Sequence, residues 1–111
     1  MNFKEYLETK INEPDKTGFV IIDGKKFPFE GKRFMNGIDN YNIPNEHIQN
    51  VAKAILKSSK ITQIKKWADE TSPTGKEYKK QLQFLKKLAK GNIGADKYLL
   101  PKSLFSKVEE N

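Results

Sequence analysis

Six lysines and one glutamine recur in the segment 74–90 at the spacing of one helix face. The set consists of Lys76, Lys79, Lys80, Gln83, Lys86, Lys87 and Lys90. Lysine carries a compact charge that suits phosphate, and lysines on one face repel each other unless solvent or a polyanion supplies counter-charge. We predict that these residues bind the phosphates of a nucleic acid. The alternative is a helix face that is only solvated.

A second set of residues could carry out metal-dependent chemistry. Two carboxylates, Asp15 and Glu30, could hold a divalent ion while Lys32 steadies an attacking water. The sequence predicts a β-hairpin whose strands, 19–22 and 25–30, flank a two-residue turn. Continued pairing across that turn puts Asp15 opposite Lys32 and near Glu30.

The fragments Pro14-Asp15 and Glu30-Gly31-Lys32 resemble those of metal-dependent nucleases of the PD-(D/E)xK class. The resemblance implies a nuclease that needs a divalent metal. It departs from the class pattern at Gly31, where an apolar strand residue is expected, and such enzymes contain more strands than this sequence predicts. The alternative is that these are turn residues at the two ends of a hairpin.

The composition excludes most other kinds of site. The chain has no cysteine, which removes disulfides, thiolate catalysis and cysteine-bound zinc. Its single histidine, His47, removes most histidine-based metal sites, and we predict that it lies on a helix surface. No resident metal and no small-molecule cofactor are therefore expected.

Two aromatic residues of the second predicted strand, Phe27 and Phe29, alternate on one face, with Lys25 and Lys26 beside them. Single-strand-binding sheets use such aromatics to stack bases. Two strands make a poor platform, however, and the inner face of a hairpin is the favoured interpretation.

The elements that must position these residues differ between the two halves of the chain. In the first half, the spacing of Asn2 and Glu5 and the apolar residues that follow predict a helix at about 2–12. The hairpin follows, and the Gly- and Asn-rich stretch 31–44 is interpreted as an ordered connecting loop.

In the second half, apolar periodicity predicts three helices at about 45–57, 60–70 and 74–90. The capping-box spacing of Thr74 and Glu77 favours a helix start there. This succession of three helices joined by short turns resembles a helix-turn-helix or winged-helix domain, whose third helix enters the DNA major groove. The resemblance implies that Thr74 faces the duplex with the first residues of the lysine set, but the third helix lacks an arginine.

For the remaining segments the sequence predicts only short secondary-structure elements. Residues 93–101 could form an extended segment, and residues 103–108 one or two last helical turns. The fold class we expect is α+β, with an N-terminal helix and a β-hairpin packed on a C-terminal three-helix unit. The chain, 1–111, is predicted to be one domain, with a helix-plus-hairpin half at 1–43 and a basic helical half at 44–111.

The charge distribution indicates the kind of partner. The formal net charge is +7, and residues 1–50 hold 7 basic and 8 acidic groups whereas residues 51–111 hold 14 and 6. Such a one-sided excess favours a polyanion, nucleic acid before membrane and DNA before RNA. Arg33 is the only arginine, so contact with the backbone is favoured over base reading. Lysine richness as a habit of the genome is the other explanation.

Three functions remain open from the sequence. The first is a non-catalytic nucleic-acid-binding protein. The second is a small adaptor or inhibitor, of the kind phages and mobile elements encode, that binds an acidic surface of a partner protein. The third is the nuclease. The chain has no apolar run long enough to span a membrane and no secretory signal, which favours a cytoplasmic protein without a membrane partner. The oligomeric state is left open.

Overall fold

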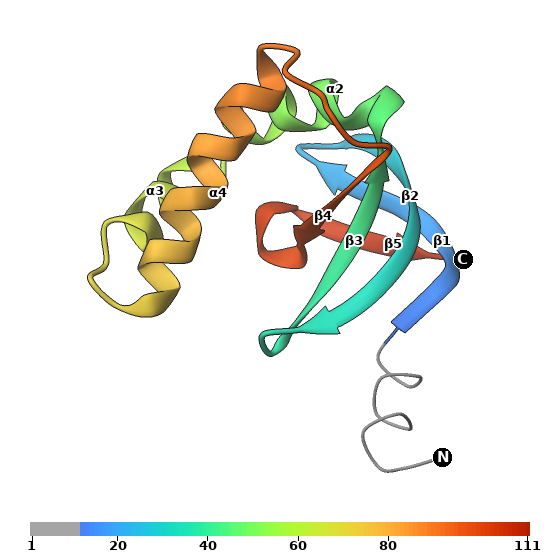
Figure 1. Cartoon of the computed structure of the whole chain (residues 1–111), viewed down its shortest axis with the longest axis horizontal. Coiled ribbons are helices and arrows are strands. Elements are labelled where there is room, and N and C mark those ends of the chain that lie inside the picture. Colours follow the sequence, from blue (N-terminus) through green and yellow to red (C-terminus); the bar gives the residue numbers. More distant parts are fainter. Residues whose placement is uncertain (1–11) are drawn as a thin grey trace.

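A computed structural model describes residues 12–111 (Figure 1). In this part of the chain five strands form one antiparallel sheet, and three α-helices come between the third and fourth strands in the sequence. The strands are β1 (Asn12–Ile22), β2 (Lys25–Met35), β3 (Ile38–Pro44), β4 (Lys97–Pro101) and β5 (Lys107–Glu110). Their order across the sheet is β4-β3-β2-β1-β5. The helices are α2 (Asn45–Leu56), α3 (Ile61–Ala68) and α4 (Pro73–Ala89).

Two tight turns organise the first three strands. Asp23 and Gly24 join β1 to β2 with φ of 48° and 82°, and Asn36 and Gly37 join β2 to β3 with φ of 56° and 78°. Positive φ at both central residues is the geometry that suits the twist of a two-residue hairpin. The predicted first hairpin is therefore confirmed. The predicted loop at 31–44 is wrong, because this segment completes β2 and forms β3.

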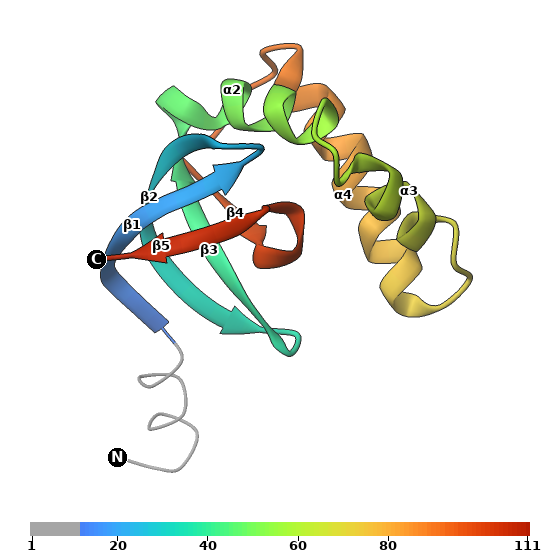
Figure 2. The ribbon, with the colours of Figure 1, turned by 180° about the vertical axis from the view of Figure 1, so that it is seen from behind.

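The last two strands form the two edges of the sheet. β4 pairs with β3 and β5 pairs with β1, so they occupy opposite edges. A single 3-10 turn, η1 (Lys102–Leu104), with two further residues, joins them. The sheet must curl for so short a connection to reach from one edge to the other, and Figure 2 shows this curvature from behind. The helical turns predicted for 103–108 are thus a 3-10 turn and a strand.

The three predicted helices of the second half are confirmed within one or two residues of their expected ends. Ile48, Val51 and Ile55 are fully buried along α2, as their spacing requires. The start of α4 differs from the prediction. Ser72 is its N-cap and accepts a hydrogen bond from the Gly75 N–H at 3.2 Å, so Thr74 does not cap the helix.

The predicted architecture is wrong. The helices do not form a separate C-terminal unit on which a hairpin packs. The chain leaves the sheet after β3, forms the three helices and then returns to the sheet as β4. The helix-turn-helix-like arrangement is overturned with it, because that prediction took the helices as self-contained. The helix predicted at about 2–12 lies outside the described residues, except for Asn12, which begins β1.

One hydrophobic core joins the sheet to the helices. The fully buried side chains of Ile43 and Leu100 from the sheet belong to the same cluster as Ile64 and Leu85 from the helices. Aromatic contacts extend it, with the Phe84 and Tyr98 ring centroids 5.7 Å apart. The sheet therefore fixes where the outer faces of α2 and α4 lie.

Candidate functional site

The predicted lysine set forms a continuous face on α4. All seven residues are exposed, and at 3.6 residues per turn they fall within an arc of about 120°. We call this set the lysine face: Lys76, Lys79, Lys80, Gln83, Lys86, Lys87 and Lys90. Leu82, Leu85 and Leu88 lie on the opposite side of the helix and are buried in the core. The lysine face is thus turned to solvent along the whole helix.

The lysine face gains little stability from residues 12–111. Four pairs of its lysines stand three or four residues apart: Lys76 with Lys79 and Lys80, and Lys90 with Lys86 and Lys87. Each such pair of like charges costs about 0.2–0.5 kcal/mol. In residues 12–111 the face has one ion pair, Lys80 Nζ to Glu77 Oε1 at 3.8 Å, and both side chains are largely exposed, which makes it weak.

The helix dipole compensates only one end of the lysine face. Lys86 and Lys87 lie in the last turn of α4, where the partial negative charge of the carbonyls favours cations. Lys76 lies near the other end, and the first turn carries no acidic residue. Lys76 is therefore placed against the dipole, and an external anion would relieve this unfavourable interaction.

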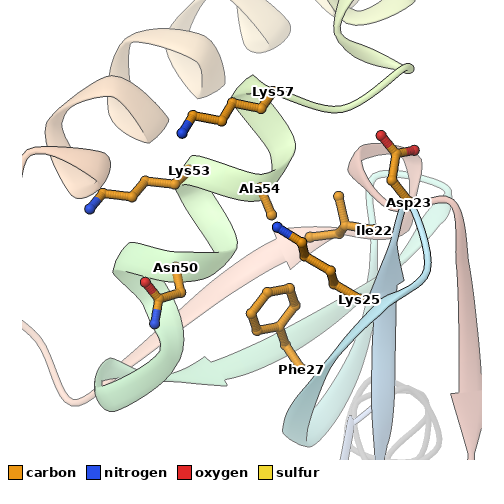
Figure 3. Close-up of a pocket in the computed structure, with 8 residues that line it drawn as sticks. All are labelled: Ile22, Asp23, Lys25, Phe27, Asn50, Lys53, Ala54 and Lys57. Carbon is orange, nitrogen blue, oxygen red and sulfur yellow. The ribbon is translucent and has the colours of Figure 1, made fainter.

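A second basic region lies between the β1–β2 turn and α2, and the sequence did not predict it as a site (Figure 3). Lys25 reaches it from β2, and Lys53 and Lys57 come from α2. In the sequence these lysines are just polar positions of a strand and of a helix. Only the packing of α2 beside the hairpin brings them to one groove, with Phe27 half-buried in it. Phe29, by contrast, is fully buried, as predicted.

The structure does not bring the nuclease candidates together. The hairpin keeps the predicted register from Ile22 and Lys25 as far as Thr17 and Glu30, and then the register shifts so that Glu13 lies opposite Lys32. Asp15 falls in the unpaired stretch. Lys32 shares the face of its strand partner Tyr41, whereas Glu30 is exposed and lies 4.0 Å from Lys97.

The change of face coincides with Gly31, whose φ is +116°. A side chain is strained at this φ, and a Cβ there would also meet the Asn42 side chain. The register shift lies beside this residue, where residues 14–16 of β1 stand opposite Gly31 alone, and it breaks the alternation on which the predicted proximity of Asp15 and Lys32 depended. Among the described residues, no group of three or more His, Asp or Glu side chains is placed to hold a metal ion.

Lys32 belongs instead to a polar cluster at one end of the curled sheet. Its Nζ lies 2.9 Å from Glu110 Oε1 and 3.6 Å from Asp39 Oδ2. The Tyr41 hydroxyl donates to Glu110 at 3.4 Å. The hydrogen bond with Glu110 raises the pKa of Lys32, and the same bond lowers the pKa of Glu110. Burial, followed by the charges of Asp39 and Glu110, raises the pKa of Tyr41 to about 12.

His47 is partly exposed on α2, as predicted, with its Nε2 3.7 Å from Glu46 Oε1. No helix in the described part of the chain is long and apolar enough to cross a membrane. Comparison of the chain with family models, with curated proteins and with solved structures gives no match. The functional assignment therefore depends on the surfaces described above.

Proposed function

We propose that the protein binds nucleic acid without covalent chemistry, DNA before RNA, and that the lysine face of α4 contacts the backbone phosphates. The observation that supports this proposal is the arrangement of α4 itself. Its cations share one exposed face, have one weak ion pair within the described residues, and repel each other along the helix. A phosphate backbone supplies the counter-charge that such a face needs.

The proposed binding mode is independent of base sequence. Reading of guanine edges normally uses the fork of an arginine side chain. The only arginine, Arg33, lies on β2 opposite Asn40 of β3 and not on α4. Lysines position a phosphate backbone but carry no sequence information of their own. We therefore expect affinity that varies little with sequence and falls steeply with salt.

The test is charge reversal on α4. The Lys79→Glu, Lys80→Glu, Lys86→Glu, Lys87→Glu variant should lose binding to a labelled DNA in fluorescence anisotropy while keeping its circular-dichroism helix signal. A matched pair of double variants controls for net charge. Lys86→Glu, Lys87→Glu should weaken binding strongly, whereas the same change at Lys97 and Lys102 should have little effect, because those exposed lysines are not on α4.

Two results would overturn the proposal. One is DNA affinity that the α4 reversal leaves unchanged. The other is no DNA affinity at all together with one stoichiometric protein captured from a nuclease-treated lysate, which would favour the adaptor. Salt dependence separates the two functions further. Duplex binding should show log affinity falling linearly with log salt, at a slope of about 0.9 for each phosphate that the protein neutralises.

A further inference from the structure

The groove between the β1–β2 hairpin and α2 combines positive charge with an apolar wall. It has a volume of about 380 Å³, which is within the range of small-ligand sites. Figure 3 shows Lys25 extending from the hairpin toward α2, with the Phe27 ring beneath it. Lys53 and Lys57 extend from successive turns of α2, with their ends on the side of the helix away from Lys25 and Phe27. Asn50 adds an amide to the same groove.

The charge of the groove is not balanced from within. None of its three lysines forms an ion pair with another described residue. Asp23, the one carboxylate among the described residues that line the groove, accepts hydrogen bonds from the Ser59 N–H and from the Ser59 hydroxyl, both at 2.8 Å. These two bonds, with a smaller contribution from the charge of Lys25, lower the pKa of Asp23. The groove therefore keeps a net positive charge that attracts an anion.

The groove and the lysine face belong to neighbouring helices, α2 and α4. The Gln49 side chain on α2 donates to the Ala89 carbonyl on α4 at 3.2 Å, so the two helices meet there. Lys53 and Lys57 follow Gln49 at intervals of four residues and hence lie along the same side of α2. Lys90 follows Ala89 directly. A polyanion that lies on α4 can thus continue across the contact between α4 and α2 to the groove.

We propose that this groove binds one unpaired nucleotide of single-stranded DNA whose neighbouring phosphates lie on the lysine face. Its base packs against Phe27, Asn50 hydrogen-bonds the edge of the base, and Lys25, Lys53 and Lys57 hold the flanking phosphates. A paired base is stacked on both faces and cannot enter, whereas a single strand can turn a base outward onto an aromatic ring. This inference rests on the proposed function and specifies its substrate as single-stranded.

The experiment compares an oligothymidine of about 15 nucleotides with a blunt duplex of the same length, both by anisotropy. Phe27→Leu keeps an apolar side chain but removes the π face, and it should weaken single-strand binding by about fivefold or more without changing duplex affinity. Phe27→Tyr should restore binding. Phe19→Leu is the control, because Phe19 is also an aromatic side chain beside a lysine, Lys26, but it is exposed on the other face of the sheet.

A second variant tests the proposed contacts between the lysines of the groove and the phosphates. Lys53→Gln, Lys57→Gln should lower the salt slope of single-strand binding by about 1.4, at about 0.7 for each phosphate left without its lysine, and thermal unfolding should confirm that the variants fold. The inference is overturned if Phe27→Leu and Phe19→Leu bind the single strand alike, or if the lysine variant weakens duplex and single strand equally. In either case the α4 reversal still reports on the proposed function. Wild-type protein that binds neither DNA overturns both.

Discussion

Raising the pH should weaken the fold through the polar cluster around Tyr41. Burial raises the pKa of Tyr41 from 10.0 to about 12, so the folded state keeps the phenol proton more tightly than the unfolded state does. Above pH 10 the folded state then binds more protons than the unfolded state, and the free energy of unfolding falls as the pH rises. The raised pKa of Lys32 acts in the same direction at higher pH.

The size of the effect follows from the two pKa values of Tyr41. At about pH 11, ionisation favours the unfolded state by a factor of about ten, which corresponds to about 1.4 kcal/mol. The full effect, beyond the higher pKa, is about 3 kcal/mol. Tyr41→Phe removes the titrating group and loses only the 3.4 Å hydrogen bond to Glu110, so near neutral pH it should change stability by about 1 kcal/mol at most.

Urea unfolding at several values between about pH 8 and pH 11, followed by circular dichroism, measures the difference. Wild-type protein should lose about 1.4 kcal/mol more over this range than Tyr41→Phe does. Absorbance titration of the phenols at alkaline pH should show that the last tyrosine to ionise is missing from the variant. Parallel stability curves for the two proteins would show that the pKa of Tyr41 is not raised, and the reasoning about this cluster would be wrong.

Two substitutions on α4 test how the helix is held. Gly75→Ala should destabilise the protein by about 1–3 kcal/mol in urea unfolding, because a Cβ there would clash with the Glu70 carbonyl oxygen; an unchanged midpoint would contradict the close packing at this helix start. Leu85→Ala should cost about 2–5 kcal/mol, since the side chain is fully buried, yet the DNA affinity of the folded protein should be unchanged because the lysine face lies on the other side; loss of affinity in the folded variant would contradict that separation.

The sequence predicts those parts of the fold that local patterns determine. The first hairpin and the three helices follow from a turn signature and from apolar periodicity over a few residues. β3 was missed because its composition is polar for a central strand. Asn40 is buried there, but its side-chain amide donates to the carbonyls of Met35 and Ile38 at 3.4 and 3.0 Å, so its burial leaves no unpaired amide.

Local sequence patterns cannot predict which distant strands pair with each other. β3 pairs with β4, so that Asn42 lies opposite Leu99, and the segment between them in sequence contains all three helices. β5 pairs with β1 across almost the whole chain. No short window of sequence carries these pairings, and the predicted packing of a hairpin on a separate three-helix unit was wrong for this reason.

The candidate sites divide in the same way. The lysine face could be predicted because one helix carries all of it, and helical periodicity alone gathers its members. The groove could not, since Phe27 and Lys53 come to line it only through the packing of α2 beside the hairpin. The register shift beside Gly31 separates Asp15 from Lys32. The alternation of side chains does not predict it, although a glycine inside a strand often marks such an irregularity.

The sheet also determines how the two basic surfaces act together. Two hydrogen bonds tie the helical segment to the rest of the fold. The Asn45 N–H at the start of α2 donates to the Asp96 carbonyl just before β4 at 2.8 Å, and the Tyr78 hydroxyl on α4 donates to Ser103 in η1 at 2.6 Å. These contacts tie the helices to the segment around β4 and η1, so we expect the lysine face and the groove to keep their spacing in the free protein. A surface arranged in advance loses less conformational entropy on binding, so disrupting the Tyr78 hydrogen bond should reduce affinity for the single strand while leaving every lysine in place.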